Sequence, residues 1–162
     1  MDNTEFDDRY RRIKNVRFGV NVSVMPFVNL YGCDVGDNSF IGPFVEIQHG
    51  VKIGTNVRIE SHTFICTGVT IEDNVFIGHG VTFVNDLYPP RYNEDFWEKT
   101  IVCEHSSIGN NATILPVKIG KYVIIGAGST VTKDVEDSTI VAGNPAKVLR
   151  RREGKGIVNR GH

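Results

Sequence analysis

Large apolar residues recur at every sixth position across the middle of the chain. They fill nine successive steps without a break, at Val35, Ile41, Ile47, Ile53, Ile59, Ile65, Ile71, Ile77 and Phe83. Four places after each of the first eight stands a small or β-branched residue, namely Ser39, Val45, Val51, Val57, Thr63, Val69, Val75 and Val81. A strand repeats every two residues and a helix every 3.6, so neither alone gives a period of six. The pattern predicts a chain that turns a corner every six residues, so that three short sides close one coil of a triangular prism around stacked aliphatic residues.

The repeat extends beyond this block with small irregularities. Before it, Val16, Val22 and Val28 keep the step, and after it further units open at Ile108-Gly109, Ile119-Gly120 and Ile125-Gly126. Asparagines stand near the expected corners, at Asn38, Asn56, Asn74 and Asn110. Asparagine and glycine tolerate the positive φ that a tight corner requires. We therefore expect one all-β domain, a parallel β-helix over residues 1–150.

Three departures from the repeat are informative. Residues 84–100 contain Pro89, Pro90 and the single tryptophan Trp97, and paired prolines cannot continue a central strand. We expect an external loop there, either one that carries binding residues or one that is merely packed on the surface. The step from Ile114 to Ile119 is five, which predicts a tightened corner. After the repeat we expect a looser strand, a turn and a short C-terminal helix, followed by a basic, mobile tail over residues 151–162.

Composition and charge narrow the function classes. The 162 residues carry a net charge of −1 with a pI of about 6.5, which argues against a dedicated nucleic-acid binder. The three cysteines, Cys33, Cys66 and Cys103, form no CxxC motif, so neither a disulfide framework nor a structural zinc site is expected. The first ten residues are polar and acidic and contain no apolar run. These features predict a cytoplasmic protein with reduced thiols, no membrane partner and no nucleic-acid partner.

The repeat over residues 16–150 resembles the hexapeptide-repeat acyltransferase superfamily. This resemblance implies left-handed coils, an exception to the usual right-handed crossover, and a homotrimer with acetyl-CoA bound between subunits. The segment IGAGSTVTKDVEDSTIVAGNPAKVLR resembles the closing motif of the acetyltransferases in that superfamily. The resemblance implies a CoA site formed by Gly126, Ala127, Gly128, Lys133, Asn144, Pro145, Lys147 and Arg150. The glycines and alanine would face the pantetheine arm and the cations would pair with phosphates, unless they are simply corner residues and solvated charges.

The stretch that leads into the external loop, together with the first residues of that loop, resembles N-acetyltransferases that act on nucleotide-linked 3-amino sugars. The branch pattern F-x-N-D-x-Y-P is matched by Phe83, Asn85, Asp86, Tyr88 and Pro89. The family's usual YPR is interrupted here by a second proline before Arg91. The resemblance implies that Asn85 orients the amine and that the CoA sulfur finally takes the proton. Glu60, His62, Tyr88 and Arg91 are candidate sugar or nucleotide contacts, or else an ordinary polar rim.

Amide formation requires a neutral amine, so the ammonium form of the substrate must lose a proton. Asn85 cannot take that proton, because its amide does not titrate, but it can accept a hydrogen bond and hold the amine in line. Asp86 is a candidate to stabilise the ammonium or relay the proton, and His79 is a candidate general base. His62, nearly one coil before His79, is expected near the same edge.

Two other functions remain open at this point. One is an O-acetyltransferase of a small sugar or alcohol, in which a histidine base is indispensable, and the other is a non-catalytic β-helix scaffold. A metal hydrolyase of the γ-class carbonic anhydrase type needs two histidines five residues apart. His49, His62, His79 and His105 offer no such pair, so no metal is expected.

Overall fold

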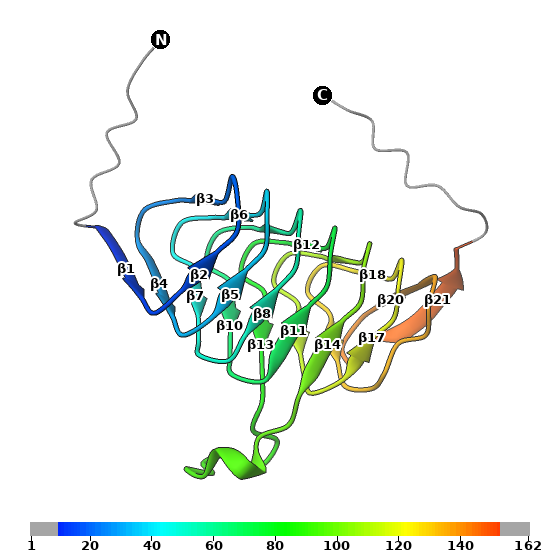
Figure 1. Cartoon of the computed structure of the whole chain (residues 1–162). Helices are drawn as coiled ribbons and strands as arrows, with labels where there is room; N and C mark the ends of the chain where they lie inside the picture. The colour runs from blue at the N-terminus through cyan, green and yellow to red at the C-terminus, as the bar shows by residue number, and fades with distance from the viewer. Residues whose placement is uncertain (1–9, 153–162) are drawn as a thin grey trace.

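The structure is a computed structural model that describes residues 10–152. The chain forms an all-β solenoid in which three parallel sheets make the sides of a triangular column (Figure 1). Sheet A contains β1 (Arg11–Lys14), β4 (Val28–Tyr31), β7 (Glu46–Ile47), β10 (Phe64–Ile65), β13 (Thr82–Phe83), β16 (Thr113–Ile114) and β19 (Thr130–Val131). Sheet B contains β2 (Arg17–Phe18), β5 (Asp34–Val35), β8 (Lys52–Ile53), β11 (Val69–Ile71), β14 (Thr100–Val102) and β17 (Lys118–Ile119). Sheet C contains β3 (Ser23–Val24), β6 (Phe40–Ile41), β9 (Arg58–Ile59), β12 (Phe76–Ile77), β15 (Ser107–Ile108), β18 (Ile124–Ile125), β20 (Thr139–Ala142) and β21 (Lys147–Arg151).

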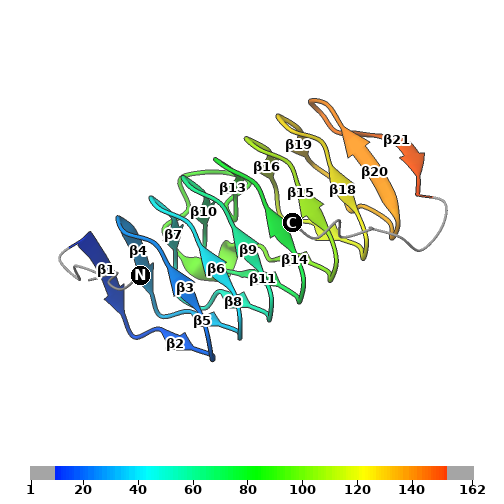
Figure 2. The same ribbon diagram turned by 90° about the horizontal axis from the view of Figure 1, so that it is seen from above.

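Strand pairing gives the length of a coil. Glu46 pairs with Phe64 and Arg58 pairs with Phe76, so partners lie three hexapeptides apart along the chain. Seen from above, the coils are stacked regularly from β1 to β21 (Figure 2). The period of six in the sequence therefore corresponds to one side of the column, as predicted.

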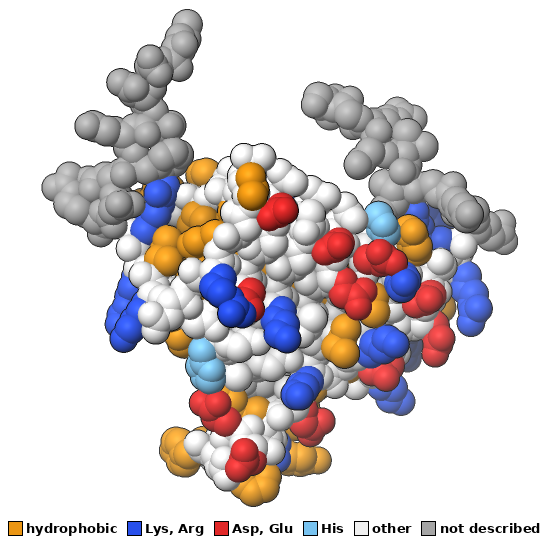
Figure 3. Space-filling model, in the orientation of Figure 1, with side chains coloured by type: hydrophobic (Ala, Val, Ile, Leu, Met, Phe, Trp, Pro, Cys, Tyr) orange, Lys and Arg blue, Asp and Glu red, His pale blue; other side chains and the backbone are white. Residues whose placement is uncertain are grey.

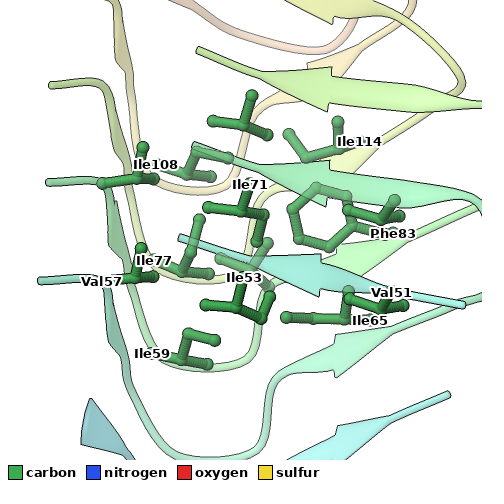
Figure 4. Close-up of a cluster of buried hydrophobic side chains, with 14 of the residues drawn as sticks. Val51, Ile53, Val57, Ile59, Ile65, Ile71, Ile77, Phe83, Ile108 and Ile114 are labelled. Atoms are coloured by element: carbon green, nitrogen blue, oxygen red, sulfur yellow. The ribbon is translucent and has the colours of Figure 1, made fainter. Parts of the chain in front are cut away.

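The repeated aliphatic residues fill the interior. Most two-residue strands place an exposed or half-buried residue first and a buried residue second, as in Arg58 and Ile59 of β9. Side chains from all three sheets meet inside the column (Figure 4). The largest fully buried ones are Phe83, Leu30, Ile41, Ile47, Ile59, Ile65, Ile71, Ile77, Ile108, Ile114, Ile119 and Ile125. Burying each contributes about 1.5–3 kcal/mol, so this stack is the main source of stability.

The corners use positive φ angles at the expected residue type. Asn38, Asn56 and Asn74 have φ of 56°, 55° and 59°, which confirms three of the four predicted corner asparagines. The fourth prediction is wrong by one place, because Asn111 rather than Asn110 has positive φ, at 57°. Asn111 stands three residues after Ile108, which is the position that the other three asparagines share.

The external loop is confirmed and lies between β13 and β14. Thr82 pairs with Thr113, so this coil is much longer than three hexapeptides, and the additional residues leave the column. The loop projects from the corner between sheets A and B and contains the short 3-10 helix η2 (Glu94–Phe96) (Figure 1). The predicted tight corner is also present, since Val102 pairs with Ile119, 17 residues later, one residue fewer than three hexapeptides.

The predicted short C-terminal helix is wrong for the part of the chain that the structure describes. After β20 the chain turns at Gly143, whose φ is 104°, and returns as β21, antiparallel to β20. Glycine accepts this φ without a steric penalty, so the turn forms a hairpin that caps sheet C. Of the predicted basic tail only Arg151 and Arg152 are described, and Arg151 ends β21; the expectations for residues 1–9 and 153–162 lie outside the described residues. Among residues 10–152, no helix has the length and apolar character needed to cross a membrane.

The cysteines are free and buried. Burial raises the pKa of Cys33 and of Cys66 to about 11, and it raises that of Cys103 as well. The thiols are therefore protonated at neutral pH and unsuited to nucleophilic chemistry.

Candidate active site

Two edges of the column carry the residues that the sequence singles out. The CA edge joins sheet C to sheet A and consists of residues 42–44, 60–62, 78–80, 109–111 and 126–128. The AB edge joins sheet A to sheet B and consists of residues 48–50, 66–68, 84–99, 115–117 and 132–134. The width of sheet A separates the two edges in one chain.

Asn85 stands at the base of the loop on the AB edge. Its backbone carbonyl accepts a hydrogen bond from the Glu98 N–H at 2.9 Å, which closes the neck of the loop. Its side-chain Nδ2 donates to the carbonyl of Thr67, one coil earlier, at 3.1 Å. Because Nδ2 is committed to that carbonyl, the Asn85 Oδ1 atom is the one left to accept a hydrogen bond from a ligand.

Asp86 is bound by the loop itself. Its carboxylate accepts hydrogen bonds from the side-chain Nε and the backbone N–H of Arg91, both at 2.7 Å, and from the Tyr88 N–H at 3.0 Å. Burial opposes ionisation of this carboxyl group, but these hydrogen bonds and the charge of Arg91 outweigh burial and lower the pKa of Asp86. With both oxygens engaged, Asp86 is suited to hold the loop in shape. The geometry does not favour the predicted alternatives, ammonium stabilisation or proton relay.

The outer part of the loop has further anchors. Trp97 donates from its indole Nε1 to the carbonyl of Arg91 at 3.0 Å. Glu94 of η2 approaches the ring of His49 on the column, with 3.3 Å between Oε1 and Nε2. The tip exposes hydrophobic side chains below the column (Figure 3), and Tyr88 is 75% exposed. The loop is thus fixed at its base and open at its tip.

The loop should loosen at acid pH. The pKa of Asp86 is depressed in the folded loop, so its stabilisation is complete above the ordinary value of 3.8 and is lost as the pH falls below it. We expect the fluorescence of Trp97, the single tryptophan, to change below about pH 4 before the column unfolds. Asp86→Asn should show the same change at neutral pH, whereas Asp95→Asn should not. Identical acid titrations for the wild type and Asp86→Asn would contradict this role.

His79 lies on the other edge, in a polar cluster. Its Nδ1 is 2.9 Å from the Ser61 hydroxyl oxygen, and its Nε2 is 3.9 Å from Oε2 of Glu60. The backbone N–H of His79 donates to Oδ1 of Asn110 at 3.0 Å. Glu60 is only 14% exposed and pairs with Arg58, but at 3.9 Å it lies beyond hydrogen-bond distance of His79, so the Ser61 hydroxyl is the group that can orient the imidazole. The three predicted catalytic residues therefore do not form one cluster within a chain: Asn85 and Asp86 share one edge and His79 occupies the other.

His62 shares the CA edge with His79, as predicted, but its ring belongs to an aromatic ladder. It has a positive φ of 63° and stacks on Phe44, with 4.8 Å between ring centroids. Phe44 stacks in turn on Phe27 at 5.1 Å. Sequence reasoning missed this ladder, although its members recur at close to one coil along the chain.

The three small residues of the predicted CoA site also lie on the CA edge. Gly126, Ala127 and Gly128 follow β18, and Ala127 lies two coils beyond His79, about 10 Å along the column at the usual strand spacing. Gly109, one coil earlier, must lack a side chain, because a Cβ there would be 2.6 Å from the Ala127 backbone nitrogen. A Cβ on Gly128 would meet no atom within 4 Å, so the backbone is open to a ligand at Gly128, whereas a Cβ on Gly126 would lie 2.7 Å from Cβ of Ala142.

The remaining predicted CoA contacts gather at the C-terminal end of the column. Lys133 is on the AB edge after β19, and Lys147 and Arg150 are on β21. Asn144 and Pro145 form the exposed turn between β20 and β21. All five are exposed, and the turn is joined to the start of β19 in sheet A because the Gly143 carbonyl accepts from the Thr130 N–H at 3.0 Å. In residues 10–152 no group of three or more histidine, cysteine or acidic residues is arranged to hold a metal.

Comparisons with known proteins agree with this architecture. The family model for the bacterial transferase hexapeptide (six repeats) matches residues 32–67, and the model for the hexapeptide repeat of succinyl-transferase matches residues 99–133. Both models describe hexapeptide repeats of transferases, so two separate stretches of this chain match that repeat. A probable macrolide acetyltransferase of Lysinibacillus sphaericus is 38% identical over 73% of the chain, which spans 62% of that relative. The chain spans a third or less of the length of seven other curated relatives.

Two solved structures of acyltransferases are similar to this chain. A hexapeptide-repeat-containing acetyltransferase from Vibrio cholerae, solved with acetyl coenzyme A, is 27% identical with a TM-score of 0.66 and covers 76% of this chain and 72% of its own. A variant of AntD, an N-acyltransferase from Bacillus cereus solved with dTDP and coenzyme A, has a TM-score of 0.76 and covers 94% of this chain and 90% of its own. At 23% identity, the second comparison establishes the shared fold alone.

Proposed function

We propose that this hexapeptide-repeat protein is an acetyl-CoA-dependent N-acetyltransferase for the amino group of a nucleotide-diphosphate-linked amino sugar, a precursor of a surface polysaccharide. The observation that carries the proposal is the fixed amide of Asn85 at the base of the loop. An amide oxygen held in one orientation can accept a hydrogen bond from an amine and align its lone pair with the thioester carbonyl. Alignment of this kind is the main help that amine acetylation needs, because the neutral amine is already a good nucleophile.

The proposed reaction is a direct transfer from thioester to amine. The neutral amine attacks the thioester carbonyl, the new C–N bond forms, and the C–S bond breaks. A backbone N–H along the CA edge donates to the developing oxyanion, as is common in acyl transfer. The CoA thiolate leaves and takes the amine's proton, so acetamide and CoA thiol are the products and no protein base is consumed.

Assembly completes the proposed site. Asn85 lies on the AB edge, whereas Gly126, Ala127 and Gly128 lie on the CA edge, with open space beside Gly128. A ligand that touches both must lie between the AB edge of one copy and the CA edge of another. A closed ring of three copies provides three such clefts, each with acetyl-CoA between subunits. Lys133, Lys147 and Arg150 would pair with the CoA phosphates there.

The supporting comparisons concern other proteins. The Vibrio cholerae acetyltransferase binds acetyl coenzyme A and AntD binds dTDP and coenzyme A, so the fold accommodates both proposed ligands. Tyr88 and Arg91 in the loop, and Glu60 and His62 on the CA edge, would contact the sugar or nucleotide. Arg91 is held over the Tyr88 ring, with 5.2 Å from its guanidinium carbon to the ring centroid, so the two present one joint surface.

The test is an acceptor panel. Purified protein is incubated with acetyl-CoA and dTDP- or UDP-linked 3-amino and 4-amino sugars, and the CoA thiol released is measured. Thermal shifts report binding separately, because a ligand that binds the folded state raises its apparent stability. We expect a shift with acetyl-CoA and thiol release with at least one amino-sugar nucleotide. If acetyl-CoA causes no thermal shift and no acceptor gives thiol release, the proposal is rejected.

A second candidate, O-acetylation of a sugar or small alcohol, is favoured by one observation. His79 has a partner that can orient it as a base, because the Ser61 hydroxyl oxygen lies 2.9 Å from Nδ1, and the Glu60 carboxylate lies 3.9 Å from Nε2. An alcohol holds its proton far more tightly than an ammonium does, so O-acetylation depends on such a base.

Replacing His79 with asparagine separates the two candidates. N-acetylation should keep its kcat within about threefold, whereas loss of a general base costs about 10²–10⁴-fold. His105→Asn is the matched control, because His105 stacks on Tyr122 with ring centroids 4.9 Å apart on the corner between sheets B and C. A hundredfold loss in His79→Asn alone would favour the O-acetyltransferase.

A further inference from the structure

Behind Asn85, two residues on earlier coils form a hydrogen-bonded support. Gln48, Thr67 and Asn85 stand at the AB edge, and each lies about one coil from the next. The Thr67 backbone N–H donates to Oε1 of Gln48 at 3.1 Å. The Thr67 carbonyl accepts from Nδ2 of Asn85 at 3.1 Å. One residue thus connects the side chain of Gln48 to the side chain of Asn85.

We propose that Gln48 is a positioning residue that sets the orientation of the Asn85 amide through the backbone of Thr67. The inference rests on the proposed function, since it assigns Asn85 the task of orienting the amine. The inference adds Gln48 to the site. Gln48 directly follows β7 on the AB edge, two coils before the loop, and lies outside the loop motif.

The orientation of the amide decides which atom meets the substrate. With Nδ2 toward the Thr67 carbonyl, Oδ1 is left to accept from an amine. A flipped Asn85 amide would set its oxygen against the carbonyl oxygen and offer an N–H donor to the amine, so two hydrogen bonds would be lost. The position of the Thr67 carbonyl therefore determines whether Asn85 presents its Oδ1 acceptor to the amine.

Thr67 depends on Gln48 for its own N–H, although the next carbonyl along the corner, that of Gly68, accepts from the Thr100 N–H at 3.2 Å. Thr67 lies between β10 and β11, outside the strand ladder, and its N–H donates to the Gln48 side chain and not to a neighbouring backbone carbonyl. The Thr67 hydroxyl is buried and has no hydrogen-bond partner among the described residues, so it does not fix the corner either. The next residue, Gly68, has a φ of +92°, and glycine has the widest backbone freedom of any residue. Without Gln48, the carbonyl that holds Asn85 can shift.

Paired variants of Gln48 test the acceptor. Gln48→Met keeps the length of the side chain and removes the acceptor, whereas Gln48→Glu keeps an oxygen that can accept from Thr67. We expect Gln48→Met to lower kcat about three- to tenfold, the loss associated with one hydrogen bond, without changing the KM for acetyl-CoA. Gln48→Glu should keep kcat within about twofold of the wild-type value. Gln48→Ala is the second acceptor-free variant and should match Gln48→Met.

A double-mutant cycle separates positioning from a general structural role. In an Asn85→Ala background the Gln48→Met change should cause no further loss, because there is no amide left to orient. An equal fold-loss in both backgrounds would overturn the inference.

A measurement without substrate keeps this inference separate from the proposed function. Side-chain amide NMR of Asn85 should show slowed hydrogen exchange in the wild type and in Gln48→Glu, and faster exchange in Gln48→Met and Gln48→Ala. An Asn85 amide signal that is the same in all four proteins would overturn the inference even if the enzyme is active. Absence of turnover with every acceptor, together with the expected NMR change, would reject the proposed function and leave the support of the Asn85 amide established.

Discussion

Asn85→Ala is expected to lower kcat about a hundredfold, the cost of losing the alignment of a reacting group. The side chain touches the amine in the proposed reaction and is held in place from below by the Thr67 carbonyl. The KM for acetyl-CoA should stay unchanged, because the predicted pantetheine contacts at Gly126, Ala127 and Gly128 lie on the other edge of the column. Steady-state kinetics with the best acceptor from the panel measure both constants.

Two further variants sharpen this result. Asn85→Asp keeps the oxygen but replaces the Nδ2 donor, so its carboxylate would face the Thr67 carbonyl with no hydrogen to share, and kcat should fall as far as in Asn85→Ala. Asn93→Ala is the control in the same loop, because its Oδ1 caps η2 by accepting from the Asp95 N–H at 3.0 Å. A kcat within threefold of wild type in Asn85→Ala would contradict the assigned role.

Ile77→Ala should lower the free energy of unfolding by about 2–5 kcal/mol, the usual cost of emptying a buried aliphatic site. Ile77 is fully buried and lies in register between Ile59 and Ile108 of the neighbouring coils. A cavity at one level removes contacts from the coils on both sides, and a solenoid depends on contacts between neighbours. Chemical denaturation followed by circular dichroism measures the change.

Ile101→Ala is the matched control for this effect. Ile101 occupies the outward position of β14 and is 40% exposed. Its replacement should change the free energy of unfolding by about 0.5 kcal/mol or less, as at other surface positions. Similar losses at the two isoleucines would mean that inward and outward positions do not alternate as the pairing register shows.

The period of six predicted the column because it comes from a physical constraint on every coil. Each side of the prism must place one large residue inward, so Val35 to Phe83 could be assigned to the core from spacing alone. The same spacing contains information about the edges. Residues six apart, such as His79 and Asn85, lie on neighbouring corners, while residues one full coil apart, such as Ser61 and His79, share one. The separation of the predicted catalytic residues was therefore implicit in the repeat.

Segments without the repeat were harder to predict. The bonds of Asp86 to Arg91 and of Trp97 to the Arg91 carbonyl arise inside an irregular loop, where no period relates one residue to the next. The sequence predicts a short helix between the end of the repeat and the tail over residues 151–162, where the pattern gives no period to follow. The strand β21 that forms instead depends on pairing with β20, and strand formation depends strongly on such tertiary context.

The most direct test of the account compares two acceptors that differ in one group. One is each dTDP- or UDP-linked amino sugar of the acceptor panel in turn, and the other is the same nucleotide sugar with a hydroxyl in place of the amine. Both are incubated with wild-type protein and acetyl-CoA, and the products are identified by mass spectrometry. We expect a stable acetamide from the amine and no ester from the alcohol. Acetylation of the alcohol at a comparable rate, or no acetylation of any amine, would contradict this expectation.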